Sequence, residues 1–151
     1  MLKFDDAWFS AEGKQGGLPV IIRARQNLGS IAGVESHPEL LRICWPFVPD
    51  AASGLPGTEL NDRMNAFEEA IITDLERDQL CIFFCVYLHD GVKRWFAYTR
   101  DVQATSQRIN AALVGHPRYP IEITVEDDPA WQEYADLLAG TVGMPGVRRT
   151  G

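Results

Sequence analysis

Cysteine and histidine residues near the middle of the chain are the first candidates for chemistry. Cys81, Cys85 and His89 lie four residues apart in one apolar stretch, and His37 is a more distant candidate base. A cysteine nucleophile needs a thiolate beside a histidine in an accessible cleft. These residues therefore favour, as the alternative function, a small enzyme with hydrolase or thiol-dependent activity. A cysteine within an apolar strand is more often a small buried hydrophobe.

The spacing of potential ligands predicts neither a metal nor a cofactor. The three histidines are scattered in or beside predicted turns, without the two-on-one-helical-face spacing of zinc ligands. On one strand, Cys81 and Cys85 would stand about 13 Å apart at about 3.3 Å per residue, too far to share an ion. The glycine-rich segments do not match a phosphate-binding loop, which needs a strand-to-helix junction with a Lys and a hydroxyl residue. We expect no metal and no cofactor.

Acidic residues gather at Glu126, Asp127 and Asp128, directly before the last predicted helix. Carboxylates at this position cap a helix and oppose its dipole, which explains the run without a ligand. An acidic surface that receives a protein partner is the functional alternative.

The elements that position these residues are organised around a hairpin over residues 80–100. Two runs rich in Val, Ile, Phe, Tyr and Trp flank Asp90 and Gly91. Asp-Gly supplies the positive φ angles of a two-residue turn, so the pair predicts a tight hairpin. The turn also explains Asp90 without an acid-base role beside His89.

Both faces of this hairpin are largely apolar. A two-residue turn pairs Phe84 with Ala97, so that Ile82 and Phe84 share one face while Cys81 and Cys85 share the other. A sheet with one solvated face would alternate apolar with polar residues, so both faces must be covered. We expect helices on one face and terminal segments on the other, or an aromatic surface covered by a partner.

The remaining segments predict an α+β protein. Strands are expected over residues 4–9, 18–25, 39–47, 80–89, 92–99 and 119–126, and helices after caps at Thr58, Asp101 and Asp128, with Pro129 in the first turn of the last helix and Gly140 at its end. From residue 39 the order matches a ferredoxin-like split βαβ (βαββαβ) sheet, with an N-terminal β-hairpin in front and a C-terminal helix behind. The apolar strand over residues 80–89 would lie at an edge, so the strand over residues 18–25 should pair beside it.

The bulk properties indicate one domain over residues 1–140 and a mobile C-terminal tail over residues 141–151. A formal charge of −7 disfavours direct nucleic acid binding, which needs a concentrated basic surface. No apolar run approaches the roughly 20 residues of a membrane span. Three cysteines without a secretory signal favour reduced thiols, and we expect a cytoplasmic protein.

Three segments carry a family resemblance. They are the Asp-Pro-x-Trp-x-x-Tyr pattern of Asp128, Pro129, Trp131 and Tyr134, the strand over residues 95–99, and the Tyr-Pro-x-Glu-Ile run over residues 119–123. Together they resemble a bacterial family catalogued as domain of unknown function 695, over most of the chain. The first pattern is also similar to the B-type protein regulators of ribonuclease E, small acidic α+β proteins that act by binding the enzyme. The family resemblance implies a ferredoxin-like fold and no established activity. The similarity to the regulators is confined to a short segment, so it does not make ribonuclease E the partner.

These observations favour a non-enzymatic protein-interaction or regulatory module that binds a basic protein partner or forms a homodimer. The candidate interaction residues are aromatic or acidic: Phe83, Tyr87, Phe96, Tyr98, Trp131, Tyr134, Glu126 and Asp127. A small-molecule site between the sheet and the loop over residues 48–57 is a third possibility.

Overall fold

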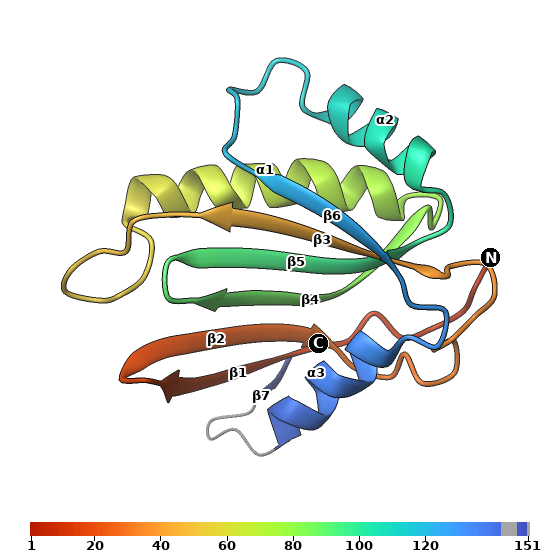
Figure 1. The fold of residues 1–151 in the computed structure, drawn as a ribbon, viewed down its shortest axis with the longest axis horizontal. Helices are drawn as coiled ribbons and strands as arrows, with labels where there is room; N and C mark the ends of the chain where they lie inside the picture. The colour runs from red at the N-terminus through yellow and green to blue at the C-terminus, as the bar shows by residue number, and fades with distance from the viewer. Residues whose placement is uncertain (143–147, 151) are drawn as a thin grey trace.

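The computed structural model describes residues 1–142 and 148–150, which form a mixed α+β protein (Figure 1). The strands of this part of the chain form one sheet in the order β6-β3-β5-β4-β2-β1-β7, in which neighbouring strands are antiparallel. The elements are β1 (Trp8–Gln15), β2 (Leu18–Arg25), β3 (Glu39–Pro46), α1 (Thr58–Glu76), β4 (Cys81–His89), β5 (Val92–Thr99), α2 (Val102–Ala112), β6 (Glu122–Asp127), α3 (Gln132–Val142) and β7 (Arg148–Thr150). The predicted α+β class is confirmed.

The central hairpin is formed by β4 and β5, as predicted. Asp90 and Gly91 have φ angles of 45° and 77°, the left-handed conformation that a two-residue turn demands. Val86 therefore lies opposite Trp95.

The predicted register is wrong beyond Cys85. A β-bulge between Phe83 and Cys85 places Phe83 opposite Ala97. The extra residue turns Cys81 to the other face of the sheet from Cys85. Alternation along one strand cannot reveal such a bulge, because both faces of β4 are apolar.

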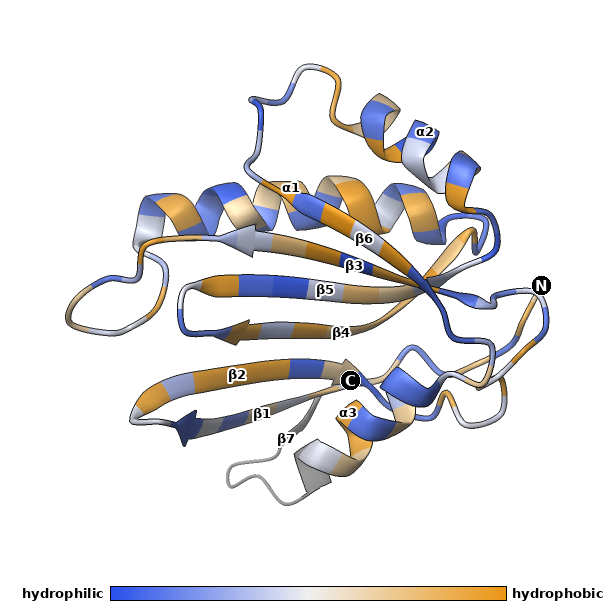
Figure 2. Cartoon of the chain, viewed as in Figure 1, coloured by the Kyte–Doolittle hydropathy of each residue, from blue (hydrophilic) through white to orange (hydrophobic). Residues whose placement is uncertain are grey.

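Each face of the sheet carries a hydrophobic core, so the predicted coverage of both faces is confirmed. The core beneath α1 and α2 includes Met64, Phe67, Ile71, Leu75, Trp45, Trp95 and Ile109. The core on the opposite face includes Phe9, Leu28, Phe84, Tyr98, Trp131 and Tyr134, with Leu2 and Phe4 packed against it. Figure 2 shows the matching alternation of hydrophobic and hydrophilic residues around α1. The chain's own terminal segments cover the second face.

The sheet extends beyond β4 through the N-terminal hairpin. β2 pairs with β4, which confirms the predicted protection of that apolar strand. The strand order of the whole sheet differs from a bare four-stranded split βαβ unit, because β2, β1 and β7 follow β4. The expected strand over residues 4–9 is wrong, because pairing with β2 along its whole length sets β1 at Trp8–Gln15.

Two helix starts differ from the prediction. Gly57, rather than Thr58, is the N-cap of α1, and it makes no side-chain cap hydrogen bond. α3 begins at Gln132 rather than Pro129 and continues past Gly140 to Val142. The predicted cap of α2 is confirmed, because the Asp101 side chain accepts a hydrogen bond from a backbone N–H of the first turn.

The predicted mobile tail over residues 141–151 falls partly outside the described residues, which omit 143–147 and 151. Residues 148–150 form β7, which pairs with β1. Within the described chain, none of the helices combines the length and apolarity needed to cross a membrane.

Candidate functional site

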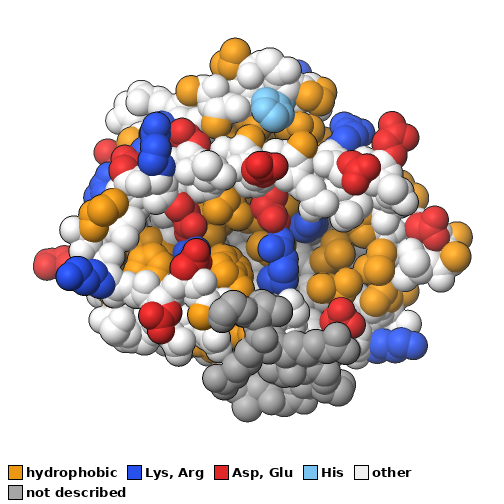
Figure 3. Space-filling model, turned by 180° about the vertical axis from the view of Figure 1, so that it is seen from behind, with side chains coloured by type: hydrophobic (Ala, Val, Ile, Leu, Met, Phe, Trp, Pro, Cys, Tyr) orange, Lys and Arg blue, Asp and Glu red, His pale blue; other side chains and the backbone are white. Residues whose placement is uncertain are grey.

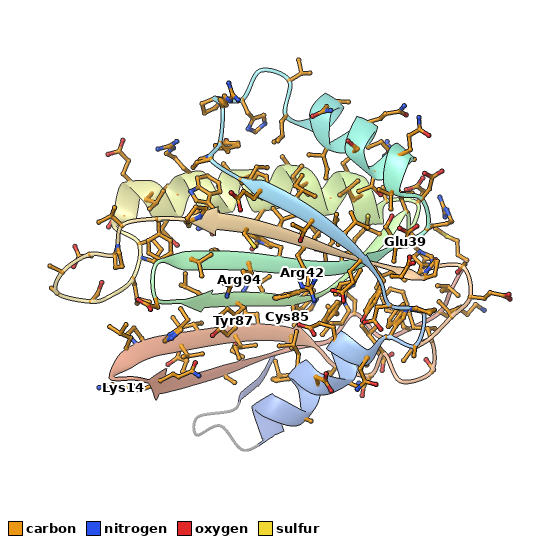
Figure 4. The ribbon with its side chains drawn as sticks, in the orientation of Figure 1. Lys14, Glu39, Arg42, Cys85, Tyr87 and Arg94 are labelled. Carbon is orange, nitrogen blue, oxygen red and sulfur yellow. The ribbon has the colours of Figure 1, made fainter. Side chains whose placement is uncertain are left out.

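The two cysteines proposed as nucleophiles are buried on opposite faces of the sheet. Cys81 lies in the core beneath α1. Cys85, labelled in Figure 4, lies in the core under α3. Burial raises the pKa of the Cys81 thiol, and it raises the pKa of Cys85 to about 12. Both groups are therefore held as thiols, the form that is a poor nucleophile.

The histidines proposed as bases are engaged by the backbone. His37 Nε2 lies 2.7 Å from the carbonyl oxygen of Gln79, and burial lowers the pKa of His37. His89 Nδ1 lies 3.0 Å from the carbonyl oxygen of Pro19. Among the described residues, neither ring is hydrogen-bonded to a cysteine, and no group of three His, Cys, Asp or Glu is placed to hold a metal ion.

Most of the aromatic interaction candidates lie inside the protein, which corrects their assignment to a surface. Phe83, Phe96, Tyr98, Trp131 and Tyr134 are all buried. The rings of Tyr98 and Trp131 stack with centroids 4.2 Å apart and planes 6° apart. Only Tyr87 is partly exposed, with the Arg94 guanidinium 5.7 Å from its ring centre (Figure 4).

The Asp-Pro-x-Trp-x-x-Tyr segment docks α3 onto the sheet. Asp128 accepts hydrogen bonds from the Tyr98 hydroxyl at 2.6 Å and from the backbone N–H groups of Gln132 and Glu133. The Trp131 indole donates to the carbonyl oxygen of His37 at 2.9 Å. Burial acts to raise the pKa of Asp128, but these hydrogen bonds outweigh it and hold the pKa below its ordinary value.

A buried arginine that the sequence reasoning missed lies at the end of β2. Arg25 is 4% exposed and donates to both carboxylate oxygens of Glu76, at 2.7 and 3.1 Å, and to the Phe83 carbonyl oxygen at 3.0 Å. Glu76 in turn accepts the Phe83 N–H at 2.9 Å. The pair thus satisfies the backbone of β4 beside the bulge, where the ladder to β2 has ended. This role is structural.

A second polar cluster lies nearby between α1 and the sheet. Glu68 accepts hydrogen bonds from Arg23 at 2.6 Å and from the Trp95 indole at 2.9 Å, with the Lys93 ammonium 4.0 Å away. Figure 3, seen from this side, shows acidic and basic side chains close together around a hollow. An adjoining cavity of about 460 Å³ is lined by Arg23, Glu68 and Trp8 among others. The basic side chains of this cluster lie beside acidic ones, so their charges largely compensate one another.

The loop over residues 48–57 borders the third predicted site, that for a small molecule. A cavity of about 650 Å³ lies there, and Trp45, Phe47, Leu60 and Arg63 are among the residues that line it. The cavity is open to solvent beside the start of α1, where the N-cap Gly57 makes no side-chain hydrogen bond.

The acidic candidates lie on β6, at one edge of the sheet. Among the strands that the structure describes, β6 has a neighbour on one side only, β3. All six of its residues are exposed, and the apolar Ile123 and Val125 are 41% and 40% exposed. The structure thus brings Glu126 and Asp127 together with two apolar side chains and with Glu122, which the sequence reasoning had not singled out.

The direction in which the backbone groups of β6 point follows from one backbone hydrogen bond and the register. The Asp128 N–H donates to the Pro38 carbonyl oxygen at 2.9 Å, which continues the β3–β6 register by one residue. Hydrogen-bonded pairs alternate along an antiparallel ladder, so Glu126, Thr124 and Glu122 also bond inward to β3. The N–H and C=O groups of Ile123, Val125 and Asp127 therefore point away from the sheet.

The side chains of β6 alternate between two kinds of surface. Ile123 and Val125 lie opposite Ile43 and Leu41, so they share the face covered by α1. Glu122, Thr124 and Glu126 occupy the other face, where Glu126 accepts from Arg42 at 2.6 Å. One face of this edge thus carries the apolar Ile123 and Val125 followed by Asp127, and the other carries Glu122, Thr124 and Glu126.

The chain was compared with protein families, curated proteins and solved structures. Residues 6–139 match the model of the Family of unknown function (DUF695). The chain belongs to this family. The DUF695 match runs from just before β1 into α3, so it includes the β6 edge. No curated protein and no solved structure matches the chain.

Proposed function

We propose that this DUF695 protein is a non-enzymatic interaction module that binds a protein partner through the free edge of β6. The observation that carries the proposal is the outward backbone of Ile123, Val125 and Asp127, on a strand whose residues are all exposed. An extended segment can add to such an edge by main-chain hydrogen bonds, with its side chains providing specificity.

Three further features support this proposal over a thiol enzyme. The buried Cys81 and Cys85 have raised pKa values, and each candidate histidine is engaged by backbone oxygen. The likeness of the segment at residues 128–134 to regulators of ribonuclease E adds an example of action by binding, without naming a partner for this chain.

We also propose that the unit from β3 to β6 is a ferredoxin-like split βαβ arrangement. The sheet order β6-β3-β5-β4 and the positions of α1 and α2 on one face support this assignment. In that arrangement β6 is an edge strand by topology, while the N-terminal hairpin protects the opposite side at β4.

A proline substitution at an outward position tests the proposed function. Val125→Pro removes an outward N–H, while Val125→Ala shortens the side chain and keeps that N–H. Tagged protein should capture the same partner from lysate with the native chain and with Val125→Ala, and at least tenfold less of it with Val125→Pro. Equal capture by all three chains, or no captured protein, would contradict the proposal. Matching urea unfolding of the two variants controls for folding.

A further inference from the structure

The alternation along β6 specifies the chemistry of a strand that could pair with it. Cross-strand neighbours lie on the same face of a sheet, so each β6 side chain meets one kind of partner residue. Ile123 and Val125 would face apolar residues on the helix side, while Glu122 and Glu126 would face basic residues on the other side. We infer that the partner contributes an extended segment in which Lys or Arg alternates with apolar residues. This inference rests on the proposed function and names its partner class.

The charge of the edge disfavours one self-pairing of this strand with a second copy of the chain. The antiparallel self-pairing that sets Ile123 against Val125 also sets Glu122 of one copy against Glu126 of the other, twice across the two-fold axis. Like charges directly opposite in a sheet destabilise the pair. A basic segment in the same position replaces both repulsions with attractions.

The charge remains available to a partner even though one carboxylate has an internal neighbour. Arg42 forms an ion pair with Glu126 and also lies 4.0 Å from Glu133. One arginine therefore compensates the negative charge of these two carboxylates only in part. Asp127 and Glu122 add two exposed carboxylates to the same short strand. The negative charge of these exposed carboxylates is therefore larger than the positive charge of Arg42, and it can attract a basic partner.

A synthetic peptide tests the inference on the purified protein. The probe is acetyl-Lys-Val-Lys-Val-Lys-Val-amide, and the control is acetyl-Lys-Lys-Lys-Val-Val-Val-amide, which has the same charge and composition without the alternation. At saturation the alternating peptide should slow amide hydrogen exchange at Ile123, Val125 and Asp127 by about tenfold, and the control should not. Increased salt should weaken the binding because it screens the exposed charges.

Charge reversal supplies the matched variants. Glu122→Lys should weaken binding of the alternating peptide by about tenfold. Glu12→Lys makes the same change of net charge at an exposed position on β1 and should leave binding unchanged. Equal binding of both peptides, or equal loss in both variants, would show attraction by net charge alone and overturn the inference.

The remaining outcomes separate this inference from the proposed function. If the peptide fails while Val125→Pro still abolishes capture of a protein, the partner class is wrong and the β6 edge remains the binding surface. If exchange at Val125 slows with protein concentration alone, the occupant is a second copy, and the inference is overturned.

Discussion

At the scale of single residues, Asp128 of the Asp-Pro-x-Trp-x-x-Tyr segment joins β5 to the start of α3. It receives the Tyr98 hydroxyl from β5 and two backbone N–H groups from the start of α3. Trp131, at a positive φ of 57°, fills the space against Tyr98. The segment therefore has a structural explanation that does not need a ligand.

Asp128→Asn should make the stability of the protein less dependent on pH in the acid range. The native pKa of Asp128 is lowered, so its carboxylate stabilises the fold above the unfolded pKa near 4, and this contribution is lost as pH falls through the folded pKa. The variant should lose about 1 to 2 kcal/mol of unfolding free energy at pH 7. Urea unfolding should show this difference shrinking toward zero below pH 4, whereas a constant difference from pH 7 to pH 3 would refute the role.

The thiols discriminate between a binding protein and an enzyme. Cys44 is partly exposed, while Cys81 and Cys85 are buried. A thiol-reactive dye should label Cys44 in the native protein and reach Cys81 and Cys85 only after unfolding, because the reagent needs an accessible thiolate. Faster labelling of either buried cysteine in the native state than in urea would revive the thiol-enzyme alternative. Cys44→Ser removes the background signal.

At the scale of elements, local patterns predicted the hairpin turn and the long amphipathic helix, because each depends on neighbouring residues. The bulge in β4 and the start of α3 depend on tertiary contacts. Phe84 has no partner in the β4–β5 ladder, and beside it Arg25 and Glu76 satisfy the backbone of Phe83. The positive φ of Trp131 is held by stacking on a ring more than thirty residues away. No periodicity within one segment encodes such pairings.

Gly91→Ala should destabilise the central hairpin. Gly91 has a φ of 77°, and an added Cβ would lie 2.9 Å from the Phe47 carbonyl oxygen. We expect a loss of about 1 to 2 kcal/mol from the left-handed backbone alone. Gly29→Ala is the control, since no atom lies within 4 Å of its Cβ position and it should stay within about 0.5 kcal/mol of the native chain. Thermal unfolding that ranks the two variants equally would contradict this account of the turn.

At the scale of the whole molecule, composition could not separate core from surface. Phe83 and Tyr98 were predicted as interaction residues because both hairpin faces are apolar, yet α1 and α3 cover them. Glu126 and Asp127 could be predicted to be exposed, since a core rarely accepts an unpaired carboxylate. Their position on an edge depends on strand order, so it could follow only from the predicted topology and not from residue type.

The most direct measurement of the central claim is residue-resolved amide hydrogen exchange along β6, in the free protein and in the complex recovered by capture. Binding at this edge should slow exchange at Ile123, Val125 and Asp127, whose N–H groups point outward. Exchange at Thr124 and Glu126, already bonded to β3, should change little and serves as an internal reference. Unchanged exchange at the three outward positions in a complex that is protected elsewhere would contradict β6 as the binding surface.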